Sequence, residues 1–392
     1  MESDFAIVNG TLVAESSLLP NATIQIKNGK VERISSFQAG LSRDAVKVDV
    51  GGAYVSPGFI DLHVHGTGGY DSTDATRAAL SGLREALLPY GVTTVVPTLL
   101  SSPTAVIRAF LEAVKSEVSA NESGAKIVGA HLEGPFLNAA QRGVHLEENL
   151  KAPSIKMFNE FTEGYRGLVK IMTLAPELEG ALSVIHECKR VGIVTSIGHT
   201  DASYSEATTG IEAGISHSTH TFNAMSQLHA RDPGSVGAVL SSNNVYAEVI
   251  ADGIHVHPSN VRLLIQMKWA TRTILVTDAV KPTGTTTKEF EMGGIKASVR
   301  DGSVRTPEGK LCGSTLTMDR AIRNVRSWTN RSIPEIIRMA SLNPAEQLGI
   351  ADTTGSLVEG KDADIVILDK ELTVKATYVR GVQRYAGDAT RP

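Results

Sequence analysis

Two histidines separated by one residue, His63 and His65, end the apolar part of the segment GFIDLHVHGTGG, residues 58–69. Residues i and i+2 of an extended strand point to the same side, so the two imidazoles are expected to face together and to bind one ion. Asp61 belongs to the same alternation, and we expect it to hydrogen-bond an imidazole from behind. The alternative interpretation is a pair of ordinary buried histidines.

Further carboxylates and imidazoles follow other short apolar runs of the sequence. Glu133 follows KIVGAHL, His199 follows GIVTSIG, and Asp278 follows TILVT. His220 and His255 lie just beyond two more such runs. Burying this many polar side chains together is costly unless they are coordinated or hydrogen-bonded. A divalent metal ion coordinates both kinds of group, so the pattern predicts a metal site.

The predicted donor set contains nitrogen and oxygen atoms and no thiolate. Zn, Fe(II), Mn and Co all suit such a set. Three protein ligands plus a water molecule make a catalytic site, because the ion lowers the pKa of its water toward about 7. A carboxylate beside that water can act as base and then as acid; Asp278 is the candidate, unless it only caps a helix. Five histidines are interpreted as structural or solvent-facing: His131, His186, His217, His229 and His257.

The elements that must position these residues are short apolar runs that alternate with helical stretches. Strands separated by helices pair in parallel, and eight of them are typical of a (β/α)8 barrel whose chemistry lies at the carboxyl ends of the strands. The candidate strands are residues 58–65, 93–98, 126–134, 168–177, 192–200, 214–223, 245–253 and 273–279. An open doubly wound sheet is the alternative. The sequence has neither a G-x-G-x-x-G after the first strand nor a G-x-x-x-x-G-K-[ST] to support it.

The two ends of the chain read as β structure. Residues 1–56 and 355–392 contain short β-branched runs between Asn-Gly, Gly-Gly and Asp turns. We expect them to form one small β-sandwich domain, with the catalytic barrel at residues 57–354. The segment TGTTTKEFEMGG, residues 283–294, is the best candidate for a flexible loop.

Composition excludes several partners and compartments. The net charge of -4 gives no basic face for nucleic acid. No apolar run approaches the roughly 18 residues of a membrane span. The start, MESDFAIVNG, does not resemble a signal peptide, so we expect a cytoplasmic protein. Cys188 and Cys312 are expected to be reduced, with a single bridge between them as the alternative.

Several motifs carry a resemblance to a known family. PGFIDLHVHG, HLEGPF, GHTDA, THTFNAM and LVTDA resemble the amidohydrolase superfamily. RGVH and CGSTLTM, taken with HLEGPF and THTFNAM, more closely resemble the family of N-acetylglucosamine-6-phosphate deacetylases, over essentially the whole chain. The resemblance implies removal of the acetyl group from N-acetyl-D-glucosamine 6-phosphate to give D-glucosamine 6-phosphate and acetate, in amino-sugar catabolism or recycling.

The resemblance also implies the ligands of the metal. Glu133, His199 and His220 would hold the catalytic ion. Some members lack the H-x-H pair and use a single ion, but this chain keeps His63 and His65. One or two ions per subunit are therefore expected, the second held by the H-x-H pair together with Glu133 and Asp278. Other branches of the superfamily bridge two metals with a carboxylated lysine, which this chain lacks at the Glu133 strand.

Substrate contacts are implied in the same way. Val144 and His145 match residues that contact the sugar. Asn223 and Ala224 would approach the phosphate region, partly through the backbone, and Arg231 would pair with the 6-phosphate, which a guanidinium suits well. Arg231 has the alternative of an ordinary surface arginine, and Asn223 that of a turn residue.

The acetyl end of the substrate has its own matching residues. His255 would polarise the acetyl carbonyl and stabilise the oxyanion. Leu311, Cys312 and Gly313 match a loop that lines the acetamido pocket. Cys312 is interpreted as a small buried apolar residue and not as a nucleophile. In the family, phosphate-side residues can come from a neighbouring subunit, so the resemblance implies a homodimer.

Three other functions compete with this one. The first is a cyclic-amide hydrolase or a nucleobase deaminase with the same barrel fold. The motifs HLEGPF and THTFNAM argue against both of these enzyme classes. A deacetylase of the galactosamine 6-phosphate epimer is harder to separate by sequence. A scaffold or binding protein derived from the barrel is expected to lose ligands, yet every proposed ligand is present.

Overall fold

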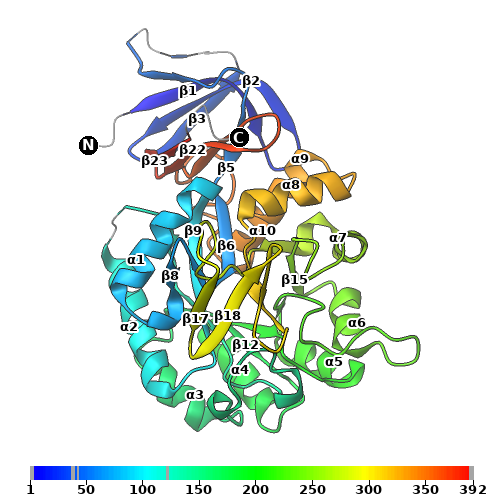
Figure 1. The fold of residues 1–392 in the computed structure, drawn as a ribbon. Coiled ribbons are helices and arrows are strands. Elements are labelled where there is room, and N and C mark those ends of the chain that lie inside the picture. Colours follow the sequence, from blue (N-terminus) through cyan, green and yellow to red (C-terminus); the bar gives the residue numbers. More distant parts are fainter. Residues whose placement is uncertain (1–3, 37–39, 42–43, 121–122, 388–392) are drawn as a thin grey trace.

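The computed structural model describes residues 4–36, 40–41, 44–120 and 123–387. Within this part of the chain, eight parallel strands with helices around them form a barrel (Figure 1). The strands are β6 (Phe59–Val64), β9 (Val92–Leu100), β11 (Ala130–Glu133), β12 (Val169–Leu174), β13 (Val194–Ile197), β14 (His217–Ser218), β15 (Tyr246–Ile250) and β16 (Thr273–Val276). The short β10 (Lys126–Ile127) also pairs with β9. Each of the eight predicted segments overlaps one barrel strand, which confirms the predicted (β/α)8 fold.

The barrel closes between its first and last strands. Val64 and Ala279 form a parallel bridge, and the backbone amide of Asp278 donates to the carbonyl of His63 at 2.9 Å. All nine residues of β9, VTTVVPTLL, are buried. Parallel strands covered on both faces have such continuous apolar sequences, and this is why the barrel strands could be found from sequence.

Helices cover the barrel because each presents one apolar face to it. The helix α8 is an example, since Met318, Ile322 and Val325 recur at helical spacing and are buried. Within the described residues the helices are α1 (Arg77–Ala86), α2 (Thr104–Ala120), α3 (Ile155–Thr162), α4 (Ala181–Val191), α5 (Tyr204–Ala213), α6 (Gly234–Ser241), α7 (Pro258–Arg272), α8 (Met318–Trp328), α9 (Ile333–Met339) and α10 (Leu342–Gln347). Short 3-10 turns are η1 (Ser72–Asp74), η2 (Leu88–Tyr90), η3 (Ala139–Gln141) and η4 (Glu147–Asn149). None of the described helices has the length and apolar character needed to cross a membrane.

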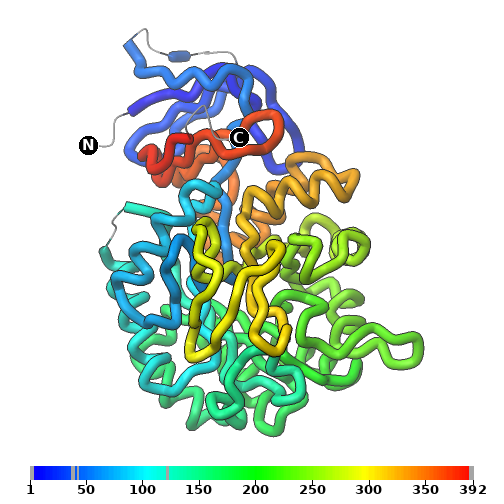
Figure 2. The backbone as a smooth tube through the Cα atoms, in the orientation of Figure 1, coloured from blue at the N-terminus to red at the C-terminus, as the bar shows by residue number. Residues whose placement is uncertain are grey.

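Strands from both chain ends form a second sheet at one end of the barrel. The red carboxyl-terminal segment lies beside the blue amino-terminal strands in Figure 2. The strands are β1 (Phe5–Val13), β2 (Leu18–Lys27), β3 (Lys30–Ser36), β4 (Lys47–Asp49), β5 (Tyr54–Pro57), β21 (Ile365–Leu368), β22 (Val374–Val379) and β23 (Val382–Ala386). In the described residues they pair in the order β23-β22-β21-β5-β1-β2-β3, with β4 on β1.

This small domain has a core of its own. Ile7, Ile24 and Val55 from the first segment pack with Ile365 and Tyr378 from the last. The two halves are hydrogen-bonded into one sheet, because β5 pairs with β1 on one side and with β21 on the other. The predicted sandwich is therefore a continuous sheet that encloses its core.

An antiparallel insert follows β16, where a flexible loop was predicted. It consists of β17 (Glu289–Met292), β18 (Ile295–Arg300), β19 (Ser303–Arg305) and β20 (Leu311–Ser314). The prediction for residues 283–294 is wrong in its second half, since Glu289–Met292 is a strand. Gly293 and Gly294, with φ of 55° and 84°, form the two-residue turn that leads into β18. A second small hairpin joins β7 (Gly66–Thr67) and β8 (Tyr70–Asp71).

Candidate metal centre and active site

The carboxyl ends of the barrel strands open into a cavity of about 180 Å³, beneath the insert. Its wall is made of side chains that end different strands or follow them in loops. The predicted residues that line it are His65, Glu133, Val144, His145, His199, His220, Asn223, Ala224, His255, Asp278, Leu311 and Gly313. His63 lies directly beneath, fully buried, in contact with His65 and Glu133. The structure thus brings together side chains from most of the barrel.

Three ligand atoms form a closed triangle in this cavity. The Oε1 atom of Glu133 lies 3.1 Å from Nε2 of His199 and 3.0 Å from Nε2 of His220, and the two nitrogens are 3.1 Å apart. The Nδ1 atom of His199 lies 2.9 Å from the carbonyl of Gln141. Since a carbonyl only accepts, Nδ1 carries the proton and Nε2 presents a lone pair to the triangle. Lone pairs and a carboxylate that face one another at this distance fit a divalent cation.

A second group of ligand atoms adjoins the first. The Nε2 atoms of His63 and His65 are 3.3 Å apart, and Oδ1 of Asp278 lies 3.5 Å from the first and 3.2 Å from the second. Glu133 serves both groups, because its Oε2 lies 3.3 Å from Nε2 of His65 while its Oε1 belongs to the triangle. The two groups of ligand atoms therefore share Glu133.

The electrostatics of the cluster favour positive charge at its centre. Burial penalises the Glu133 carboxylate, but the charge of His63 and the close contacts with the rings of His145, His199 and His220 hold its pKa well below the ordinary value. Burial also opposes charge on His63, yet the carboxylates around it raise its pKa well above 6.5. A divalent cation supplies positive charge at the same place.

The backbone is strained where several of these ligands leave their strands. His199, His220 and Asp278 have φ of 49°, 29° and 48°, in the left-handed region that non-glycine residues rarely adopt. Such conformations cost roughly 1–3 kcal/mol each and cluster at functional sites. They aim the three side chains into one cavity.

His255 is held by a carboxylate on the loop after β15. Oδ2 of Asp252 lies 2.7 Å from Nδ1 of His255, and Oδ1 accepts from the backbone amides of Ile254 and His255. Burial lowers the pKa of His255, but the hydrogen bond and charge of Asp252 outweigh it and raise the pKa above 6.5. His255 also lines the cavity.

The structure corrects the role predicted for Asp61. Its Oδ2 accepts a hydrogen bond from the hydroxyl of Thr277 at 2.6 Å, and its Oδ1 accepts from the backbone amides of His63 and Thr277. The predicted contact with an imidazole is wrong, because the side chain turns toward β16 and not toward the ring of His63. Glu248 on β15 holds that ring instead, with Oε2 at 3.0 Å from Nδ1.

Cys312 and Arg231 lie outside the cavity. Strand alternation in β20 turns Leu311 and Gly313 to the cavity and Cys312 into an apolar cluster with Val280. Cys312 is fully buried, as predicted for a small apolar residue, and does not itself line the cavity; burial raises the pKa of its thiol to about 12. Both cysteines in the described chain are free, so the alternative of a bridge is excluded. Arg231 is exposed on the loop before α6.

The remaining histidines divide as predicted between buried structural positions and the surface. The Nε2 atom of His131 lies 2.7 Å from the hydroxyl of Thr173, and that of His217 lies 2.8 Å from Glu248. The other three are exposed: His186, His229 and His257.

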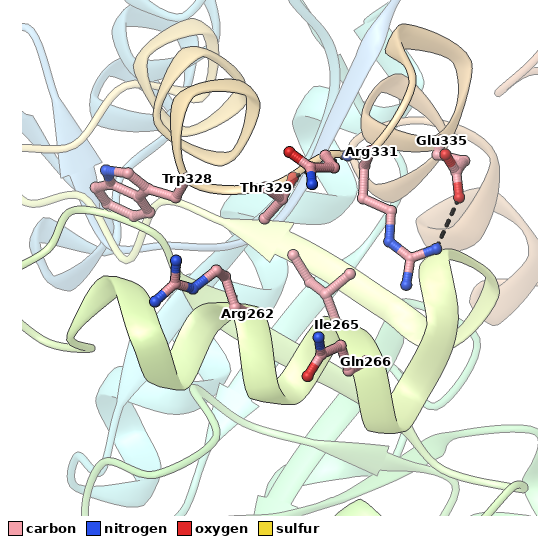
Figure 3. Close-up of a pocket in the computed structure, with 8 residues that line it drawn as sticks. Arg262, Ile265, Gln266, Trp328, Thr329, Arg331 and Glu335 are labelled. Carbon is pink, nitrogen blue, oxygen red and sulfur yellow. Dashed lines mark hydrogen bonds and ion pairs between the residues drawn. The ribbon is translucent and has the colours of Figure 1, made fainter.

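A larger hollow, of about 360 Å³, lies on the outside of the barrel between α7 and the segment that joins α8 to α9 (Figure 3). Arg262 and Trp328 line it, and Arg331 pairs with Glu335 at 2.9 Å. None of the predicted site residues lies there, so the chemistry belongs to the smaller cavity.

Comparison with known proteins gives this arrangement a family. Residues 54–384 match the amidohydrolase family. The chain belongs to the amidohydrolase family. Members of this family are metal-dependent, in agreement with the ligand groups of this amidohydrolase.

Individual relatives match almost the full length of this amidohydrolase. It is 34% identical over 384 residues to an N-acetylglucosamine-6-phosphate deacetylase of Bacillus subtilis (strain 168), covering 97% of each chain. It is 33% identical over 371 residues to an N-acetylgalactosamine-6-phosphate deacetylase of Escherichia coli O157:H7, covering 94% of this chain and 96% of the other. The crystal structure of an N-acetylglucosamine-6-phosphate deacetylase from Pasteurella multocida matches with a TM-score of 0.93 at 30% identity, covering 98% of this chain and 100% of the other.

Proposed function

We propose that the protein removes the acetyl group from N-acetyl-D-glucosamine 6-phosphate to give D-glucosamine 6-phosphate and acetate, in amino-sugar catabolism or recycling. The observation that carries the proposal is a single cavity in which Asp278 and His255 face two adjoining groups of metal-ligand atoms. Relatives of this name match the chain over nearly its whole length.

The residues present fit one or two divalent ions, Zn, Fe, Mn or Co. Glu133, His199 and His220 would hold the catalytic ion, and His63 and His65 would hold a second together with Glu133 and Asp278. When bound, the metal supplies Lewis-acid polarisation and lowers the pKa of water.

Asp278 is the proton carrier in this proposal. Burial raises the pKa of Asp278, but the charge of His63 and the hydrogen bond and charge of His65 outweigh it and keep the carboxylate ionised. Asp278 accepts a proton as water oxygen bonds to the acetyl carbon. It returns that proton to the amine nitrogen as the C–N bond breaks, so the products are acetate and the free amine.

His255 stabilises the charge that develops on the acetyl oxygen. Asp252 holds Nδ1 and favours the doubly protonated ring, which leaves Nε2–H free to donate to the oxyanion. Leu311 and Gly313 border the space for the acetamido group.

The sugar and its phosphate are bound farther out. Val144 and His145 contact the sugar. Burial lowers the pKa of His145 to about 4, so its ring stays neutral. Asn223 and Ala224 approach the phosphate. Arg231, outside the cavity of its own chain, pairs with the 6-phosphate in a neighbouring subunit of a homodimer.

We place this enzyme in the cytoplasm, with a small amino-sugar phosphate as its partner and neither nucleic acid nor membrane. The net charge of -4 gives no basic face that would bind nucleic acid. A second candidate substrate is the galactosamine 6-phosphate epimer, because one close relative has that name.

The test is release of acetate by purified protein from N-acetylglucosamine 6-phosphate, from the unphosphorylated sugar and from N-acetylgalactosamine 6-phosphate, with metal counted on the same sample. Fast release from the first substrate alone supports both the chemistry and the phosphate pocket. Preference for the third would assign the epimer instead. No release from any of them by a metal-loaded sample would contradict the proposal.

A further inference from the structure

Glu248 is a carboxylate inside the barrel for which the proposed reaction has no role. It lies on β15 and is fully buried. Its Oε2 accepts from Nδ1 of His63 and from the backbone amide of His220, both at 3.0 Å, and its Oε1 accepts from Nε2 of His217 at 2.8 Å. Both oxygens are therefore satisfied, and one of them contacts a residue from each group of metal ligands.

The contact with His63 fixes the state of that ring. An ionised carboxylate can only accept a hydrogen bond, so Nδ1 of His63 must carry its proton. The lone pair is then on Nε2, which faces His65 at 3.3 Å and Asp278 at 3.5 Å. With the other tautomer, an N–H bond would point into the ligand group and block coordination there.

His63 differs in this respect from the other proposed metal-ligand histidines. His199 is held from behind by a neutral carbonyl, that of Gln141. The Nδ1 atoms of His65 and His220 have no hydrogen-bond partner among the described residues. A carboxylate behind an imidazole raises its basicity as a ligand and fixes its orientation, so the charge of Glu248 acts mainly on the His63 side of the site.

We infer that Glu248 is a positioning residue that sets the affinity of the second metal ion, through the tautomer and orientation of His63. The inference rests on the two-ion form of the proposed function. The substitution Glu248→Gln isolates the charge. A Gln carbonyl can still accept from His63 and His220, and His217 can accept from the new amide by moving its proton to Nδ1, which has no partner in the described structure.

Asp61 offers a matched control. It is also a fully buried carboxylate beside His63, but it bonds a hydroxyl and two backbone amides and no ring. Asp61→Asn replaces a carboxyl by an amide at the same depth and leaves the imidazole contact intact. Burial raises the pKa of Asp61 to about 7, so the comparison is made above pH 7, where this carboxyl is mostly ionised.

The experiment measures metal and not activity. Wild type, Glu248→Gln and Asp61→Asn are stripped with a chelator and titrated with Zn²⁺ by calorimetry, and bound zinc is counted by mass spectrometry. Wild type and Asp61→Asn should bind two ions. Glu248→Gln should bind the first ion unchanged and the second about 10- to 100-fold more weakly.

Three results would overturn the inference. The first is a Glu248→Gln variant that binds both ions as tightly as wild type. The second is a Glu248→Gln variant with native circular dichroism that binds both ions equally more weakly. The third is a wild type that binds only one ion. If Glu248→Gln does not fold, ¹⁵N-histidine NMR of zinc-loaded wild type decides, since His63 must show a protonated Nδ1 and a metal-shifted Nε2. The metal titration uses no substrate, so its result does not depend on whether the protein releases acetate in the deacetylase assay.

Discussion

Asp278 is placed to move a proton because it is buried at the end of β16, with Oδ1 at 3.2 Å from Nε2 of His65. Asp278→Asn keeps the size of the side chain and the Glu133–His199–His220 triangle but cannot accept a proton. We expect kcat to fall by about 10²- to 10⁴-fold while at least one zinc ion per chain remains. Steady-state kinetics with metal analysis measures both. Retention of most of the activity would exclude Asp278 as the proton carrier.

Arg231 tests the phosphate side of the site. Because it is exposed and outside its own cavity, Arg231→Ala should leave the fold and the metal intact. Loss of one charged contact to phosphate should raise KM for N-acetylglucosamine 6-phosphate by about 10-fold or more, since hydrogen bonds to charged groups contribute about 1.5–3 kcal/mol. The kcat/KM for the unphosphorylated sugar is the control. An equal loss on both sugars would contradict the role.

The residues that gather in the cavity could be predicted from sequence, but the residues that support them could not. Side-chain alternation in a strand located His63 and His65, and the end of an apolar run located Asp278. Alternation did not predict the partner of Asp61, because Thr277, which donates to this carboxylate, lies 216 positions away along the chain. Glu248 was missed because it interrupts the apolar run VYAEVIADG in mid-strand; a single charge inside such a run is the signal that could have found it.

At the scale of elements, the barrel strands could be predicted and the insert could not. Parallel strands buried on both faces are continuous apolar runs, whereas EFEM and IKASVR are short and half polar, like a loop. The pair Gly293–Gly294 between them was the available signal of a hairpin. The insert matters to the site because Met292, Leu311 and Gly313 line the cavity.

The hairpin turn should therefore control substrate binding. Gly294 has φ of 84°, which a β-branched residue adopts only with strain of roughly 1–3 kcal/mol. Gly294→Val should move Met292 and raise KM several-fold with kcat little changed. Gly164→Val is the control, because Gly164 has φ of 85° with open space around it and lies before β12, away from the cavity. Equal KM values in the two variants would show that the turn does not shape the site.

At the scale of the whole molecule, a partly buried ion network joins the barrel to the small domain. Nζ of Lys126, beside β9, lies 2.9 Å from Oδ2 of Asp362 and also contacts Asp364, which is 2% exposed. The second aspartate also accepts from the hydroxyl of Thr354 and the backbone amide of Arg380. The sequence could not predict this network, because its partners are more than 200 residues apart, at 236 and 238 positions.

Lys126→Met should destabilise the protein without touching the chemistry. Removing the lysine leaves the buried Asp364 carboxylate with two hydrogen-bond donors, while Arg380 still pairs with Asp362 at 3.4 Å. We therefore expect a loss of about 1–3 kcal/mol in the free energy of unfolding. Thermal and urea unfolding should show this loss, while kcat at low temperature stays near that of wild type. Lys27→Met is the matched control, since its pair with Glu32 is 3.4 Å long and about half exposed, with side-chain exposures of 52% and 47%, and such pairs contribute at most about 1 kcal/mol. If the two variants lose the same stability, the network does not hold the domains together.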